Sequence, residues 1–139
     1  MIILDTNVVS EFMVPKPDAR VTRWLDQQPR ISIWTTSVTV FEIRFGLETM
    51  PIGKRQASLA ALFERWLVEV AEQRIAIYDD VSARTAATLA AQREKRGRPV
   101  ELRDTMIAGI VLASRATLAT RNVKHFEDIA KSVVNPWEA

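Results

Sequence analysis

Three acidic residues that lie far apart in the chain, Asp5, Glu42 and Asp104, have the types and positions needed for chemistry. Asp5 directly follows the apolar run Ile2–Leu4, and Asp104 opens an apolar helical segment. Glu42 interrupts a helical segment that is otherwise apolar. Carboxylates that gather in a partly dry cleft repel one another, so they either take up protons or hold a cation. A divalent metal ion is the economical explanation, and Mg²⁺ or Mn²⁺ suits such oxygen ligands.

Each acid has an expected role and an ordinary alternative. We expect Asp5 and Asp104 to be direct metal ligands. The helix neighbours of Glu42 are apolar or small, so we expect its carboxylate to point into the fold. There it binds metal directly, holds a metal-bound water or acts as general base towards that water. Taken singly, Asp5 could merely begin a turn and Asp104 could merely cap a helix. Their predicted meeting at one edge of a sheet favours a functional site.

Short apolar runs alternate with helical patterns along the chain, and this alternation predicts a mainly parallel sheet with helices on both faces. The expected strands cover residues 2–4, 31–34, 75–78 and 117–120, with a short fifth at 132–134. Ligands bind such sheets beyond the carboxyl ends of the strands, near the topological switch point. We therefore predict one three-layer α/β/α domain over residues 1–139, with a central sheet of four to five strands and with Asp5 at its binding edge.

The expected helices leave some interpretations open. We expect Ser37 to cap a helix whose Val38, Phe41 and Phe45 face the core. The clearest amphipathic stripe runs from Leu59 to Val70 and either packs in the core or forms a protein-binding surface. Two interpretations are also open for Trp24, Trp34 and Trp137. Each is either buried in the core or stacks on an unpaired RNA base.

Composition excludes several classes of protein. The 139 residues contain no cysteine, which rules out disulfides, thiol nucleophiles and zinc sites built on thiolates. The start has no basic n-region and no stretch approaches a membrane span, so we expect a cytoplasmic protein. A net charge of +2 mildly favours a polyanionic partner. Basic side chains crowd the approach to Asp104, where they either favour a phosphate-containing substrate or complement a helix C-terminus: Arg93, Lys95, Arg96, Arg98 and Arg103.

Four motifs occur in the order in which they occur in the PIN-domain nucleases, and the chain resembles that family over essentially its whole length. The motifs are Asp5-Thr6-Asn7, Glu42, Asp104-Thr105-Met106-Ile107-Ala108 and Ala119-Thr120-Arg121-Asn122. The nearest subgroup is similar to the VapC toxins, including FitB-like members, whose tail often reads like Val134-Asn135-Pro136-Trp137. This resemblance implies an Mg²⁺- or Mn²⁺-dependent endoribonuclease in which Asp5, Glu42 and Asp104 bind metal and activate water.

The resemblance also implies supporting residues and partners. Thr6 and Thr120 match hydroxyl positions that orient the acidic ligands. A homodimer and a small antitoxin, whose tail blocks the acidic pocket, are the implied protein partners. Many relatives carry a fourth acid at the position of Asn122 or three residues later, where this chain has His125. Asn122 still bonds a metal-bound water but adds no charge, which favours a one-metal or substrate-completed site. His125 either contacts phosphate or has no role.

The leading hypothesis is metal-assisted hydrolysis of a phosphodiester in RNA, with Arg103 or Arg121 holding the scissile phosphate. Two alternative functions remain open. A Mg²⁺-dependent phosphatase or phosphotransfer domain of similar architecture would need a second acid where this chain has Asn7. A catalytically weak RNA- or protein-binding module of the same fold is motivated by the missing fourth acid.

Overall fold

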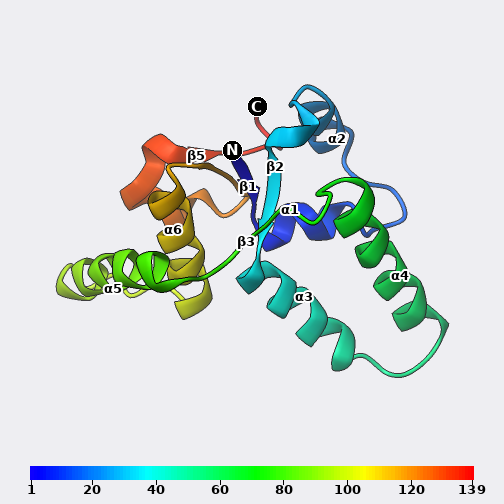
Figure 1. The fold of residues 1–139 in the computed structure, drawn as a ribbon, viewed down its shortest axis with the longest axis horizontal. Coiled ribbons are helices and arrows are strands. Elements are labelled where there is room, and N and C mark those ends of the chain that lie inside the picture. Colours follow the sequence, from blue (N-terminus) through cyan, green and yellow to red (C-terminus); the bar gives the residue numbers. More distant parts are fainter.

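A parallel five-stranded sheet runs through the middle of the molecule, in the strand order β3-β2-β1-β4-β5 (Figure 1). The computed structural model describes residues 1–139. Helices cover both faces of the sheet, so the predicted three-layer α/β/α architecture is confirmed. The strands are β1 (Ile2–Leu4), β2 (Ile33–Thr36), β3 (Ile75–Ala76), β4 (Thr117–Ala119) and β5 (Val133–Val134).

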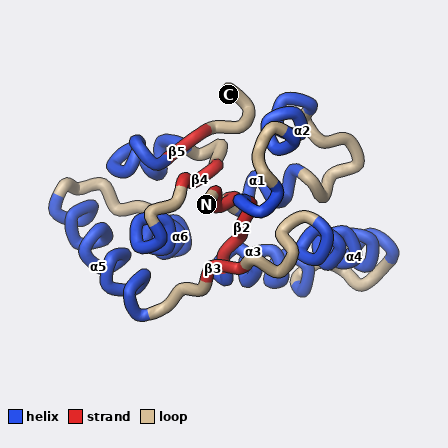
Figure 2. Tube along the Cα trace, turned by 45° about the horizontal axis from the view of Figure 1, so that its top comes forward, coloured by secondary structure: helices blue, strands red, loops and turns tan.

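The helices form two groups on opposite sides of the sheet (Figure 2). One group consists of α1 (Thr6–Glu11), α2 (Ala19–Asp26), α3 (Ser37–Glu48) and α4 (Lys54–Glu69). The other consists of α5 (Asp80–Lys95), α6 (Leu102–Ser114) and the 3-10 helix η2 (Val123–Ser132). A further 3-10 turn, η1 (Arg30–Ser32), leads into β2. None of the helices combines the length and the apolar character needed to cross a membrane.

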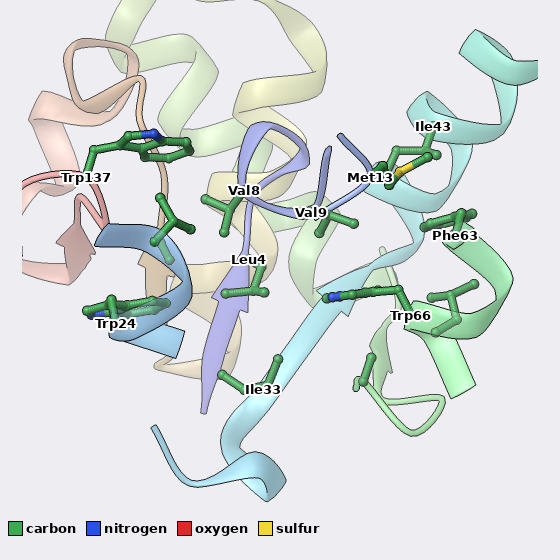
Figure 3. Packing of buried hydrophobic residues seen from close by; sticks show 14 of the residues in the cluster. Leu4, Val8, Val9, Met13, Trp24, Ile33, Ile43, Phe63, Trp66 and Trp137 are labelled. Atoms are coloured by element: carbon green, nitrogen blue, oxygen red, sulfur yellow. The ribbon is translucent and has the colours of Figure 1, made fainter. Parts of the chain in front are cut away.

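Two hydrophobic cores follow from the alternation of side chains along the strands. Leu4 of β1 faces the first core, where it packs with α1, α2, α3 and α4 (Figure 3). Its neighbour Ile3 faces the second core, with α5, α6 and η2. Burial of each large apolar side chain contributes about 1.5–3 kcal/mol to stability. The first core contains the buried residues of the amphipathic stripe, Phe63, Trp66 and Leu67, and two of the three tryptophans weighed above, Trp24 and Trp137. Core packing is therefore the correct interpretation for these residues.

Several element boundaries differ from those expected. β2 begins at Ile33 because residues 30–32 form a 3-10 turn, in which the N–H of Ser32 donates to the carbonyl of Pro29. β3 ends at Ala76, and the N–H of Tyr78 donates to the side chain of Ser37 instead of to a strand. The cap of α3 is therefore Thr36, whose hydroxyl accepts from the N–H of Thr39. The helix η2 was not predicted; it consists of short 3-10 turns with non-helical backbone at Phe126 and Ile129.

The expected inward orientation of Phe41 and Phe45 is wrong. These side chains are 58% and 54% exposed, and their rings stack with centroids 6.0 Å apart on the outer face of α3. The buried stripe of α3 consists instead of Thr39, Ile43 and Leu47, with Val38. Because α3 is apolar on several faces, the spacing of its apolar residues does not decide which face is buried.

α6 passes so close to α5 that only a glycine fits at position 109. A Cβ atom on Gly109 would lie 2.6 Å from the Cβ of Ala86 and 2.6 Å from the carbonyl oxygen of Ser82. We expect Gly109→Ala to lower the free energy of unfolding by about 1–3 kcal/mol, because the two helices must separate. Urea denaturation measures this change. Gly46→Ala is the matched control, since nothing lies within 4 Å of a Cβ there. That substitution is expected to stabilise α3 by up to about 1 kcal/mol, and an equal gain at both positions would contradict the packing argument.

Candidate active site

Asp5 lies where the order of the strands changes direction. From β1 the chain adds β2 and β3 on one side, and it later places β4 on the other side of β1. The N–H of Asp5 donates to the carbonyl of Ala119, the last residue of β4, at 2.9 Å. Parallel sheets bind ligands at such a switch point, beyond the carboxyl ends of the strands. The structure therefore places Asp5 at the sheet edge that the sequence predicted.

The carboxylate of Asp5 is buried and firmly held. Its side chain caps α1 by accepting from the N–H of Thr6 at 2.8 Å. Thr120 follows β4, and its hydroxyl donates to Oδ2 of Asp5 at 2.7 Å. The amide of Asn7 donates to the same oxygen at 3.3 Å. Burial raises the pKa of Asp5, and the nearby charge of Asp104 raises it further, although the hydrogen bonds from Thr120, Thr6 and Asn7 partly oppose this change.

Glu42 reaches the same site from α3. The hydroxyl of Thr6 donates to Oε1 of Glu42 at 3.0 Å and also bonds the hydroxyl of Thr39 at 3.1 Å. Nη1 of Arg103 lies 3.7 Å from Oε2. Burial raises the pKa of Glu42. The hydrogen bond from Thr6 and the charge of Arg103 lower it, while Asp5 and Asp104 raise it. The structure therefore brings the three acids within electrostatic range of one another.

Asp104 lies in the first turn of α6, which begins at Leu102, two residues earlier than expected. Acidic side chains in the first turn of a helix interact favourably with its positive N-terminal end. Nδ1 of His125 lies 2.8 Å from Oδ2 of Asp104. The single histidine of the chain therefore contacts one of the three acids, although the sequence left its role open. The resemblance implied an acid at this position in many family members, and the histidine found there instead was the available signal.

The remaining predicted residues divide between the site and its surroundings. Asn122 contributes its backbone N–H, which donates to the hydroxyl of Thr120 at 3.1 Å. The guanidinium of Arg121 stacks on the ring of Trp137, 4.9 Å from the centroid. The backbone N–H of Arg121 donates to the side-chain oxygen of Asn7. Sequence reasoning did not assign site roles to Asn7 and Thr39. Asn7 belongs to the motif that begins at Asp5, so its position in the sequence could have indicated a site role. Nothing in the sequence indicated a role for Thr39, because that role depends on its contact with Thr6.

The sequence placed Arg93 in a basic cluster that either faces a phosphate-containing substrate or complements a helix C-terminus. In the structure, Arg93 is buried and does not face the site. Its side chain is 3% exposed and forms a bidentate ion pair with Asp128, whose side chain is 14% exposed. The same guanidinium donates to the hydroxyl of Thr105 at 2.9 Å and to the carbonyl of His125 at 3.1 Å. The hydrogen bond from Arg93 lowers the pKa of Asp128. Arg93 therefore joins α5, α6 and η2 from within the fold.

The carboxylates do not form a ready-made metal cage, because no three Asp, Glu or His side chains lie close enough together. Glu42 faces Arg103 and Asp104 faces His125, but buried Asp5 has no cationic partner. An uncompensated buried charge is costly. A hard cation held through one or two carboxylates and several waters would offset this cost. The oxygen donors of the site therefore fit such an ion.

Comparison with known proteins identifies the class to which this fold and site belong. A model of the PIN domain matches residues 2–132. The chain belongs to the PIN-domain family.

Individual relatives match over the whole chain. Plasmid stability protein StbB of Pseudomonas syringae pv. tomato is 40% identical over 139 residues, with 100% of both chains covered. VapC ribonuclease Y4jK of Sinorhizobium fredii is 36% identical, with 99% of both chains covered. Among solved structures, that of FitAcB from Neisseria gonorrhoeae superposes with a TM-score of 0.89 at 31% identity and covers 100% of both chains.

Proposed function

We propose that this protein is a metal-dependent endoribonuclease that hydrolyses phosphodiester bonds in RNA and acts as the toxin of a toxin–antitoxin pair. The observation that carries the proposal is the buried carboxylate of Asp5, which has no cationic partner and lies within electrostatic range of Glu42 and Asp104. The relatives named VapC ribonuclease Y4jK and toxin FitB support the reaction and the biological role.

Asp5 and Asp104 would hold Mg²⁺ or Mn²⁺, with Glu42 beside them. A bound ion of this kind supplies a lowered pKa for attacking water and a polarised phosphoryl oxygen. Thr120 and Asn7 keep Asp5 in one orientation by donating to Oδ2. A ligand held in this way loses little conformational freedom when the site fills.

Glu42 would orient the attacking water and accept its proton. Thr6 fixes the carboxylate by donating to Oε1, which leaves Oε2 for that water. Arg103 is partly exposed, and its Nε and Nη2 bond Glu101. Its Nη1 lies 3.7 Å from Oε2 of Glu42, so this nitrogen is the donor placed to hold an oxygen of the scissile phosphate. In-line attack expels the 3′ oxygen and leaves a 5′-phosphate on the other product.

Two protein partners complete the proposal. A small cognate antitoxin would cover the acidic site, and two copies of the chain would form a homodimer. The relative named toxin FitB supports the antitoxin, because a toxin inside its own cell needs a neutralising partner. Sedimentation of the purified chain, alone and with a candidate antitoxin, measures both assemblies.

Digestion of total RNA tests the reaction and its metal dependence. We expect cleavage in Mg²⁺ or Mn²⁺, loss of cleavage in EDTA, and recovery when excess Mg²⁺ is added. Undiminished cleavage in EDTA would contradict the metal mechanism. Binding of RNA without cleavage, with either metal, would favour the alternative of a catalytically weak module.

A phosphatase or phosphotransfer reaction is disfavoured by Asn7. Its side-chain amide donates to Asp5 at the place where such enzymes need a second acid. An assay for inorganic phosphate released from a phosphate monoester separates this reaction from RNA cleavage. We expect no release.

A further inference from the structure

A strongly basic cavity of about 360 Å³ lies between the C-terminal end of α5 and the helix η2. Its walls contain a single hydrophobic residue. Four cationic side chains line it: Arg93, Arg96, Arg98 and Lys124. Two carboxylates, Glu127 and Asp128, also belong to its walls. The cavity therefore suits a small anionic group and does not suit an apolar ligand.

Ion pairs within the walls leave two of these cations free. Arg93 pairs with Asp128, and Arg98 pairs with Glu127. Arg96 and Lys124 are exposed and form no ion pair in the structure. Positive charge therefore exceeds negative charge in the cavity, and the excess is carried by side chains that are free to contact a ligand.

His125 connects this cavity with the candidate active site. It lines the cavity, and its Nδ1 lies 2.8 Å from Oδ2 of Asp104. The backbone carbonyl of His125 is held by Arg93, so this part of η2 has a fixed position relative to α5. His125 is therefore shared by the two places: its ring contacts Asp104 of the candidate active site, and the same residue forms part of the cavity wall.

We propose that this cavity binds a phosphate of the RNA strand that neighbours the phosphate being cut. Arginine and lysine are the side chains that bind phosphates, through charge and through several N–H donors. A strand anchored at a second phosphate is aligned along the acidic site, which reduces the entropy lost on reaching the reactive geometry. The inference rests on the proposed ribonuclease function, since it assigns the second phosphate to the same substrate.

Binding of a single-stranded RNA of about 20 nucleotides, followed by fluorescence anisotropy, tests the inference. Asp5→Asn serves as the parent protein, because we expect it to bind RNA in Mg²⁺ without cutting it. Arg96→Ala and Lys124→Ala are added together to this parent. We expect roughly tenfold weaker binding or more, and a salt dependence that is shallower by roughly 0.7 for each phosphate that the protein no longer neutralises.

Lys54→Ala with Arg65→Ala is the matched control, because it removes two exposed cations from α4, on the other side of the sheet (Figure 1). This pair is expected to change binding less than twofold. Equal weakening by both pairs, or no weakening by the cavity pair, would overturn the inference. The binding assay is independent of turnover, so failure of the wild type to cut RNA identifies a failure of the proposed function even where the cavity pair still weakens RNA binding. Conversely, a wild-type protein that cuts RNA, beside a cavity variant that binds normally, would defeat only the cavity proposal.

Discussion

Replacement of Asp5 by asparagine is expected to lower the rate of RNA cleavage by about 10³-fold or more and to leave the fold intact. Asparagine removes a negative charge from the proposed metal site, and the ion contributes several kcal/mol to stabilisation of the transition state. Each factor of ten in rate corresponds to about 1.4 kcal/mol. Single-turnover cleavage of a defined RNA, at saturating Mg²⁺, measures the loss.

The fold should survive this change for a structural reason. The asparagine oxygen still accepts from the N–H of Thr6, and its amide faces the hydroxyl of Thr120. The pKa of Asp5 is raised in the folded protein, so its ionisation costs stability. Protonated Asp5 stabilises the folded protein fully when the pH is below 3.8, the ordinary pKa of an aspartate. This stabilisation is lost as the pH rises through the raised pKa that Asp5 has in the folded protein. Metal-free Asp5→Asn is therefore expected to melt no lower than metal-free wild type at pH 7.

Two controls separate chemistry from general charge effects. Asp26→Asn changes an exposed acid at the end of α2 and should leave cleavage unchanged. Mg²⁺ or Mn²⁺ should raise the melting temperature of the wild type more than that of Asp5→Asn. If Asp5→Asn cuts RNA at the wild-type rate, the assignment of Asp5 as a metal ligand is wrong.

Arg93→Ala is expected to lower the free energy of unfolding by about 1–3 kcal/mol, because it removes a buried guanidinium and leaves the partly covered carboxylate of Asp128 without its partner. The variant also lacks the hydrogen bonds that Arg93 donates to Thr105 and to the carbonyl of His125. Chemical denaturation measures the change. Arg84→Ala is the control on the same helix, since its pair with Asp80 is exposed and exposed pairs contribute about 0–1 kcal/mol. Similar losses of stability at both positions would contradict a special role for Arg93.

The same ion pair predicts a pH dependence. Arg93 lowers the pKa of Asp128 below its ordinary value of 3.8. The stabilisation is therefore present above that value and is lost as the pH falls through the lowered pKa of the folded state. Asp128→Asn should remove this part of the acid destabilisation, which denaturation curves at pH 2–5 would detect.

The sequence was sufficient to predict the layers of the fold and the position of Asp5, because a short apolar strand followed by an acid has few other meanings in a parallel α/β pattern. The orientation of Glu42 is predicted partly for the wrong reason. Its neighbour Phe45, expected in the core, is exposed. What holds Glu42 inward is the hydroxyl of Thr6, which is 36 residues away in the chain.

Long-range pairs account for the other errors. A buried arginine and a surface arginine look alike in a sequence, and the partner of Arg93 lies 35 residues further on. The contact between His125 and Asp104 spans 21 residues. No local pattern contains such contacts, because they arise when helices that are separate in the chain pack against each other.

The position of Arg93 has a consequence for genetic selections. This residue belongs both to the wall of the basic cavity and to the junction of α5, α6 and η2. Survivors of a screen for loss of toxicity would then fall into two kinds. Changes at Asp5 or Asp104 would leave abundant, inert protein that still sequesters an antitoxin. Changes at Arg93 would leave little protein, because cellular proteases would clear it.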